Sequence, residues 1–103
     1  MEFDRKVWRL METIPKGRVT TYGLIARKLN THAYRAVGNA CRKNPYAPRV
    51  PCHRVVRSDG TIGGFAGKTS GKTVKRKIAL LKREGVEVKG LKILNFQEVL
   101  FRF

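Results

Sequence analysis

The sequence predicts a mainly helical domain of winged helix-turn-helix type, with a short β element and a glycine-rich active-site loop. Three observations lead to this fold class. Apolar residues recur at helical spacing in several segments, two short helical segments are separated by a tight connection, and glycines cluster after a β-prone run. A chain of 103 residues has the length of one domain, so we expect residues 1–103 to form a single unit.

The N-terminal segment, from about Phe3 to Thr13, is predicted to be an amphipathic helix. Its apolar residues recur three or four positions apart: Phe3, Val7, Leu10, Met11 and Ile14. A Pro-Lys-Gly run at 15–17 ends it. Residues 19–21 are β-prone, and Thr20 or Thr21 can cap the helix that follows.

A second and a third helix are expected on either side of a tight connection at residues 30–32. The third should run from about Ala33 to Lys43, stop before Asn44-Pro45, and present small residues together with basic ones. Gly38 in its middle costs about 1 kcal/mol relative to alanine, which close approach to another surface would offset. That surface is either DNA or a neighbouring helix of the same domain.

Prolines make residues 45–51 a stiff, non-helical approach to Cys52. Residues 53–56 alternate as a short strand, residues 57–60 form a turn, and residues 61–67 form a glycine-rich loop or wing. A last clear helix should run from Thr73 to Glu84 and stop at Gly85. We expect its apolar residues to point inward and its basic residues to point mostly outward: Lys75, Arg76, Lys77, Lys82 and Arg83. The apolar tail, 86–103, should close the core.

Charge is the first indication of function. Lys and Arg number 23 against 7 Asp and Glu, which gives a formal net charge of +16. No acidic residue lies between Glu12 and Asp59, which favours a surface that faces phosphates over a helix face with interleaved ion pairs. A ribosomal-type or thermophilic surface is the alternative. The cysteines and histidines do not show zinc-site spacing, and no apolar run is long enough to span a membrane.

Cys52 and His53 are adjacent, and this pair is the main candidate for chemistry. A thiol is nucleophilic only as the thiolate, so it needs a group that takes its proton. An imidazole can do so when a carboxylate orients it, and Glu84 is the candidate carboxylate. Asn44 could hydrogen-bond nearby. These residue types alone also fit a cysteine hydrolase.

The ordered motifs from about Val7 to Gly85 resemble the O6-alkylguanine-DNA alkyltransferase family, also called methylated-DNA–protein-cysteine methyltransferases. The matching segments are Arg-Ala-Val-Gly-Asn-Ala at 35–40, Asn-Pro at 44–45, Pro-Cys-His-Arg-Val-Val at 51–56, Gly-Gly-Phe-Ala-Gly at 63–67 and Glu-Gly at 84–85. The resemblance implies a single-turnover repair protein that extrudes a damaged guanine from the duplex and moves its O6-alkyl group onto Cys52. It implies no cofactor, since the thiol itself is consumed.

Further roles follow from the resemblance alone. His53 would act as base through a water, Glu84 would orient His53, Asn44 would brace the site, and Tyr22 would help to extrude the nucleotide and donate a proton. Arg35 would fill the gap left in the base stack. The implied minor-groove surface comprises Arg35, Ala36, Val37, Gly38, Asn39, Arg42 and Ser58. The implied substrate pocket comprises Cys41, Val55, Ile62, Phe65 and Ala66, and no metal is implied.

Two departures from the family pattern affect this interpretation. Family members usually carry an extra N-terminal domain, whereas this chain starts almost at the first helix of the catalytic domain. Phe65 and Ala66 stand where many relatives have tyrosine and serine. We expect a monomer that binds double-stranded DNA containing O6-alkylguanine and no membrane, and that works in the cytoplasm on the nucleoid, or in the nucleus of a eukaryote. A second domain, fused or separate, stays open.

Three alternatives remain. One is a non-enzymatic lesion-binding protein of the alkyltransferase-like group, whose members carry tryptophan where this chain has Cys52. Another is a winged-helix regulator, which would not need Cys52, His53 and Glu84 together. The third is a cysteine hydrolase, which would not need a basic half free of acids.

Overall fold

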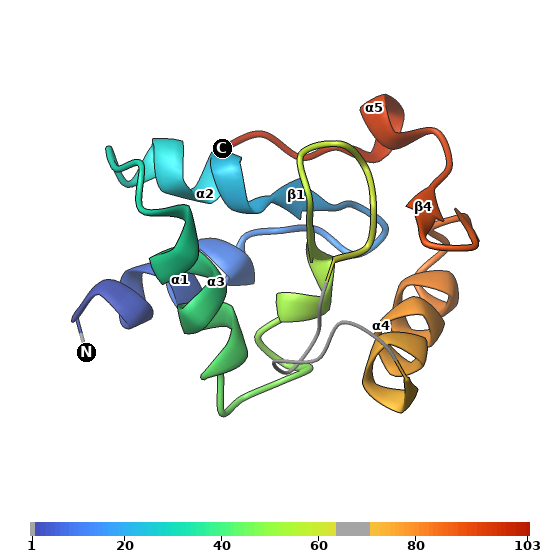
Figure 1. The fold of residues 1–103 in the computed structure, drawn as a ribbon, viewed down its shortest axis with the longest axis horizontal. Coiled ribbons are helices and arrows are strands. Elements are labelled where there is room, and N and C mark those ends of the chain that lie inside the picture. Colours follow the sequence, from blue (N-terminus) through green and yellow to red (C-terminus); the bar gives the residue numbers. More distant parts are fainter. Residues whose placement is uncertain (1, 64–70) are drawn as a thin grey trace.

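The computed structural model describes residues 2–63 and 71–103. Figure 1 shows three N-terminal helices on one side and the helix and hairpin of the C-terminal half on the other, with a short strand pair between them. Each half has its own apolar cluster. Val7, Met11 and Ile25 belong to the first cluster, and Ile62 and Leu81 belong to the second.

Helix α1 (Glu2–Glu12) buries one face and exposes the other. Val7 and Met11 are fully buried, as the spacing predicts. Two acidic residues, Glu2 and Asp4, lie in its first turn, where the positive end of the helix dipole favours them. The Trp8 indole nitrogen donates to the Ala40 carbonyl at 2.8 Å, which holds α1 against α3.

Helices α2 (Tyr22–Lys28) and α3 (Tyr34–Arg42) form the predicted helix-turn-helix arrangement. Thr21 caps α2, because its Oγ1 accepts a hydrogen bond from the Leu24 amide at 3.1 Å. The connection is tight, and Asn30 adopts a left-handed conformation in it, with φ of 56°. The capping prediction is therefore confirmed for Thr21.

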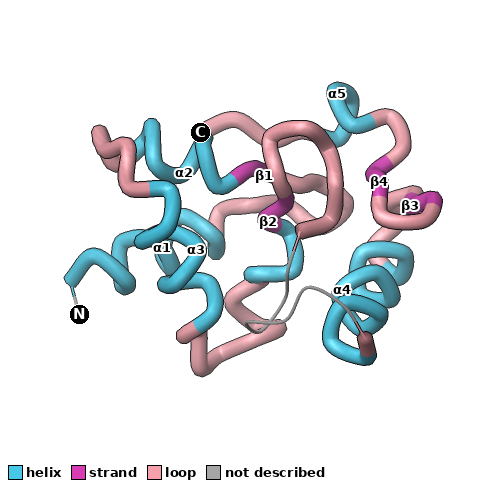
Figure 2. Tube along the Cα trace, in the orientation of Figure 1, coloured by secondary structure: helices cyan, strands magenta, loops and turns pink. Residues whose placement is uncertain are grey.

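Strands β1 (Thr20–Thr21) and β2 (Val55–Val56) pair in parallel, with Thr20 opposite Val55 and Thr21 opposite Val56. All four residues are buried. Because parallel strands end at the same edge, the residues that follow them, Tyr22 and Arg57, leave the pair together. Figure 2 shows β1 and β2 together near the middle of the domain.

The predicted strand over residues 53–56 is only half correct. Cys52–Arg54 is a 3₁₀ turn, η1, and only Val55–Val56 is strand. The turn closes when the Arg54 amide donates to the Pro51 carbonyl at 3.0 Å. The pattern of side chains misled the prediction, because the backbone entering from Pro51 is already turned, with ψ of 70°.

Helix α4 (Lys72–Arg83) ends where predicted, at Gly85, whose φ of +92° favours glycine. Val74 and Leu81 are buried, as predicted. The prediction that Lys77 points outward is wrong, since Lys77 is 0% exposed. The helical period explains this, because position 77 lies on the same face as positions 74, 78 and 81.

The C-terminal residues form an antiparallel hairpin, β3 (Val88–Lys89) and β4 (Lys92–Ile93), and a short helix, α5 (Phe96–Val99). The chain then returns beside β1, as Figure 1 shows. The Val19 amide donates to the Val99 carbonyl at 3.0 Å, and the Phe101 amide donates to the Val19 carbonyl at 2.6 Å. Phe101 and Phe103 pack on the first cluster, so the tail closes the core as expected.

Candidate active site and DNA-facing surface

Cys52 begins η1, directly after Pro51, and only 7% of it is exposed. Burial raises the pKa of the Cys52 thiol above its ordinary value, and a hydrogen bond with Asn44 and the charge of Lys77 oppose the rise. The pKa of the Cys52 thiol nevertheless remains above its ordinary value. The resting side chain is therefore a neutral, shielded thiol.

Asn44 braces the loop that leads to Cys52. Its Nδ2 donates to the Val50 carbonyl at 2.8 Å, and its Oδ1 accepts from the Tyr46 amide at 3.0 Å. The same side chain hydrogen-bonds with Cys52 and lowers the pKa of that thiol. The structure thus brings Asn44 and Cys52 together, as the sequence interpretation expected.

His53 and Glu84 are also brought together, although 31 positions separate them in the chain. His53 Nε2 lies 3.1 Å from Glu84 Oε2. Burial lowers the pKa of His53, and its contact with Glu84 offsets this only in part. Burial raises the pKa of Glu84, but hydrogen bonds from Arg54 and His53 outweigh it and the net shift is downward.

These shifts define the protonation of the pair. Glu84 is an ionised acceptor near neutral pH, so the hydrogen-bonded Nε2 of a neutral His53 carries the ring proton. Nδ1 is then the basic nitrogen. It is buried and has no hydrogen-bond partner among the described residues. His53 can therefore accept a proton at Nδ1.

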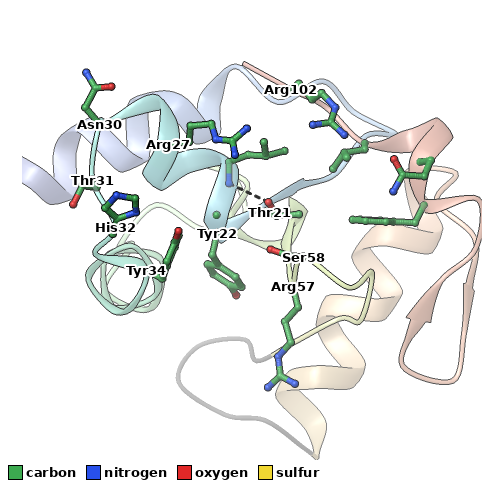
Figure 3. Close-up of a pocket in the computed structure, with 15 residues that line it drawn as sticks. Thr21, Tyr22, Arg27, Asn30, Thr31, His32, Tyr34, Arg57, Ser58 and Arg102 are labelled. Atoms are coloured by element: carbon green, nitrogen blue, oxygen red, sulfur yellow. Dashed lines mark hydrogen bonds between the residues drawn. The ribbon is translucent and has the colours of Figure 1, made fainter.

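Tyr22 is the first residue of α2 and is partly buried. Burial raises the pKa of its hydroxyl, negative charge on Cys41 or Cys52 would raise it further, and Arg57 opposes the shift. The hydroxyl thus remains a donor at neutral pH. In Figure 3 the Tyr22 ring and the Arg57 side chain point the same way from the strand edge.

The exposed face of α3 carries part of the predicted DNA-binding set. Arg35, Asn39 and Arg42 are exposed, and Ala36 and Gly38 are half-buried. Val37 does not belong to this surface, because it is 0% exposed and packs in the first cluster. One turn of a helix cannot present every residue outward, which the contiguous motif concealed.

Gly38 decides whether the small residues of α3 face a neighbouring helix of the same domain or a separate molecule such as DNA. A Cβ added there would meet nothing within 4 Å. Packing of a neighbouring helix inside the domain therefore does not explain Gly38. The open space in front of it is consistent with a surface that a separate molecule approaches.

A groove of ≈ 850 Å³ opens beside α2. Figure 3 shows Tyr22, Tyr34, Arg57 and Ser58 around it, with Arg27 and Arg102 on its far side. Ser58 is exposed there, as expected of a DNA contact. Three arginines, Arg27, Arg57 and Arg102, line the groove, whereas Cys52 does not. The groove and the Cys52 thiol are therefore distinct features of the described domain.

The expected substrate pocket is only partly described. Val55 and Ile62 are fully buried. Cys41 is buried too, its Sγ lies 3.7 Å from Met11 Sδ, and burial raises its pKa to about 12, so it behaves as a small apolar side chain. Phe65 and Ala66 lie outside the described residues.

Two functional candidates escaped the sequence interpretation. Arg54 binds Glu84 and also donates to the Ile14 carbonyl at 2.7 Å. The motif shows that residue 54 is basic, but it does not show that Arg54 pairs with Glu84. Lys77 is buried and lowers the pKa of Cys52 through its charge, and the helical register of α4 could have identified it.

The described residues offer neither a metal site nor a membrane span. Within residues 2–63 and 71–103, no group of three or more His, Cys, Asp or Glu side chains could hold a metal ion. In the same ranges no helix has the length and apolar character needed to cross a membrane.

The helix-turn-helix, its basic exposed face and the shielded cysteine define a DNA-binding domain with a candidate nucleophile. The family model described as "6-O-methylguanine DNA methyltransferase, DNA binding domain" matches residues 2–86. The chain belongs to this family. The resemblance noted in the sequence motifs is thereby confirmed, as is the mainly helical fold class.

Individual relatives agree with this assignment. The chain is 46% identical over 84 residues to a methylated-DNA–protein-cysteine methyltransferase of Shigella flexneri. This match covers 81% of this chain and 46% of the relative. The Mycobacterium tuberculosis OGT in complex with DNA matches with a TM-score of 0.73 and 41% identity, over 82% of this chain and 50% of that one. The chain spans about half the length of the curated relatives it matches.

A third match covers nearly the whole chain. Schizosaccharomyces pombe Atl1, solved in complex with damaged DNA containing O6-carboxymethylguanine, has a TM-score of 0.84 and 34% identity. The match covers 99% of this chain and 96% of Atl1. It therefore includes the C-terminal hairpin and tail, which lie beyond the family model.

Proposed function

We propose that the chain repairs O6-alkylguanine in double-stranded DNA by moving the alkyl group irreversibly onto Cys52. The observation that carries the proposal is the arrangement around Cys52. A shielded thiol is braced by Asn44, and the next residue, His53, is held by an ionised Glu84. Membership of the methyltransferase family supports the choice of reaction.

The proposed reaction is a displacement at carbon. The Cys52 thiol loses its proton to His53 Nδ1 through a water, and Glu84 stabilises the imidazolium that results. The sulfur attacks the alkyl carbon, so a C–S bond forms as the bond between that carbon and O6 breaks. The electron pair passes to the guanine, which takes a proton from the Tyr22 hydroxyl. The His53 imidazolium then releases its proton to solvent and the Tyr22 oxygen regains one, so the net transfer is of one proton from the thiol to the guanine. Unmodified guanine and a stable thioether remain, and the chain needs no cofactor.

The reactive carbon lies inside a stacked base pair, so the damaged nucleotide must leave the stack first. We assign the minor-groove contact to the exposed face of α3, where Gly38 has open space in front of it. The B-DNA minor groove is only about 6 Å wide, which favours small residues such as Ala36 and Gly38. Arg35, exposed at the start of α3, would fill the place of the extruded base.

The cationic groove at Tyr22, Arg57 and Ser58 would take the backbone next to the extruded nucleotide. We propose that residues 1–103 act as one DNA-binding and alkyl-transfer domain, as a monomer on DNA. We place it in the cytoplasm on the nucleoid, or in the nucleus of a eukaryote.

A second candidate function is binding of the lesion without transfer. The match over nearly the full length of both chains to Atl1 in complex with damaged DNA favours it. Cys52 favours transfer, because a protein that only binds a lesion has no need of a thiol braced by Asn44.

One experiment separates the two functions. The protein is mixed with a duplex carrying one O6-methylguanine and its intact mass is measured. A gain of one methyl per chain, mapped to Cys52 by peptide analysis, is expected. Tight binding to the lesion without a mass change would favour the second function, and no preference for the lesion would reject both. A duplex with unmodified guanine serves as the control.

A further inference from the structure

Lys77 is the most unusual charged residue among those described. It lies mid-helix in α4 and is 0% exposed. Its Nζ donates to the Val55 carbonyl and to the Ile62 carbonyl, both at 2.7 Å. A buried ammonium is strongly unfavourable unless hydrogen bonds and nearby negative charge compensate it. The structure thus places a positive charge in the interior, where the two backbone carbonyls accept its hydrogen bonds.

The two carbonyls belong to Val55 and Ile62, the two fully buried residues of the expected substrate pocket. Val55 follows directly on η1, the turn that carries Cys52 and His53. Ile62 immediately precedes the start of the glycine-rich segment at 63–67. A single side chain therefore connects the exit of the cysteine turn to the start of this segment. Loss of the ammonium would release both carbonyls inside the core.

The ammonium also acts on the thiols through its charge. The groups that face it electrostatically come from several elements: Cys41 of α3, Cys52 and His53 of η1, and Arg57 after β2. Lys77 lowers the pKa of both cysteines and also that of His53. In return, burial lowers the pKa of Lys77 to about 8, while negative charge on Cys41 and Cys52 raises it and Arg57 lowers it further.

Asn44 and Lys77, rather than His53, are the side chains that lower the pKa of Cys52. His53 is neutral at rest, since burial lowers its pKa, so it offers a proton acceptor but no standing charge. Lys77, with a pKa of about 8, is charged at neutral pH. His53 can thus take the proton of the thiol, while Lys77 supplies the positive charge.

We propose that Lys77 is a positioning residue for the alkyl acceptor, whose buried ammonium fixes the carbonyls of Val55 and Ile62 and stabilises the Cys52 thiolate as it forms. This inference deepens the proposed function and rests on Cys52 being the acceptor. Its effect is reciprocal, because two interacting groups titrate as a pair. Once Cys52 has become a thioether, it can no longer form the thiolate that would favour the Lys77 ammonium.

The first test measures thiol reactivity without DNA. All variants carry Cys41→Ala, so that Cys52 is the sole thiol, and alkylation by iodoacetamide is followed by intact mass from pH 6 to 10. Lys77→Met should move the midpoint of the pH–rate profile upward by about one unit, or about tenfold in rate at fixed pH below it. Lys77→Arg, which keeps the charge, should restore most of the shift. Lys75→Met, at an exposed position of the same helix, should match the parent.

A second measurement avoids substitution of Lys77 altogether. Lysine side chains labelled with ¹⁵N are titrated by NMR in the parent protein and in Cys52→Ala. The pKa of Lys77 should fall in Cys52→Ala, because alanine cannot form the thiolate charge that raises this pKa as the thiol ionises with rising pH. The same fall is expected after S-methylation of Cys52. This readout decides the matter even if Lys77→Met does not fold.

The outcomes are distinguishable from those for the proposed function. A folded Lys77→Met with an unshifted thiol profile, or a Lys77 pKa that ignores the loss of Cys52, overturns the role of Lys77. Either can be found while methyl transfer proceeds normally. Conversely, a shifted profile in a protein that never takes up methyl from DNA supports the electrostatic role of Lys77 and rejects the proposed repair activity.

Discussion

Arg54 holds Glu84 in a two-pronged contact, with Nε donating to Oε1 at 2.8 Å and Nη2 to Oε2 at 2.6 Å. The oxygen Oε2 is the one that also faces His53. Planar guanidinium and carboxylate groups match in this geometry, which fixes the carboxylate in one orientation. The imidazole of His53 is therefore positioned by a carboxylate that is itself immobilised, and Arg54 connects the pair to the end of α1 through the Ile14 carbonyl.

Glu84→Gln should slow methyl transfer without abolishing it. An amide can still occupy the site but cannot stabilise an imidazolium, so we expect a loss of about ten- to a hundredfold. Single-turnover rates on an O6-methylguanine duplex, measured as a function of pH, check this. An unchanged pH–rate profile would remove Glu84 from the chemistry. Glu87→Gln, at an exposed position nearby in the chain, is the matched control.

Cys52→Ala should abolish methyl uptake and leave DNA binding intact. The substitution removes the sulfur but keeps the turn, whose hydrogen bonds come from the backbone. Intact mass reports the uptake, and a mobility-shift titration reports the binding. Cys41→Ala should keep methyl uptake, since that buried thiol has a pKa of about 12. Methyl uptake by Cys52→Ala would show that another residue is the acceptor.

Stability should fall as the pH drops below about 6.5. The pKa of buried His53 is lowered from 6.5, so between its folded value and 6.5 the unfolded chain binds more protons than the native one. In that window stability rises with pH, by at most about 1.4 kcal/mol per pH unit for one group. The lowered pKa of Glu84 acts in the same direction at more acidic pH, because its contribution is lost as the pH falls through its folded value.

Chemical denaturation at a series of pH values between 5 and 8 measures this slope. His53→Gln should flatten the upper part of the curve, since it removes the group that must stay neutral. A slope that His53→Gln leaves untouched would mean that other groups cause the acid sensitivity. His32→Gln, at an exposed position, is the control.

Arg35→Ala should slow methyl transfer more than it weakens binding to undamaged duplex. A residue that fills the base stack acts only once the nucleotide has left it, whereas a phosphate contact acts on every duplex. Transfer rates and the salt dependence of binding are measured on the same variant. A reduced salt slope with normal transfer would make Arg35 a phosphate contact. Arg42→Ala tests whether the effect is specific to the start of α3.

Substitutions at Gly38 should affect stability and DNA binding in different ways. Alanine is the better helix former by about 1 kcal/mol, and the added Cβ meets nothing within 4 Å, so the free energy of unfolding should rise. A larger side chain, in Gly38→Leu, should weaken DNA binding sharply because it fills the space kept for the groove. Urea melts and binding titrations check the two effects. Normal binding by Gly38→Leu would place the DNA elsewhere.

The sequence predicted most elements because their signals are local. Thr21 caps α2 and Gly85 ends α4, and both act within a few residues. Glu84 was also expected to be the partner of His53, first as the candidate carboxylate and then from the family resemblance, although no local pattern links residues 31 positions apart. The motif could not show that Arg54 would share that carboxylate, since the contact depends on how η1 sits against α4.

The predictions for Lys77 and Val37 failed because the position of each residue in the fold outweighed the general rule on which its prediction rested. Lysine normally lies at the surface, so Lys77 was expected outside even though its register with Val74 and Leu81 placed it inside. Val37 was taken as a DNA contact because a motif is contiguous, whereas a helix faces two ways. The attachment of the tail to Val19 joins residues about eighty positions apart, which no local pattern encodes.

The shielding of Cys52 has a consequence for a protein that acts once. If each chain accepts a single alkyl group, as proposed, any stray electrophile that reaches the sulfur ends that chain's useful life. A neutral thiol that is 7% exposed reacts slowly with such small molecules. Burial thus protects the thiol of unreacted chains until a lesion is bound.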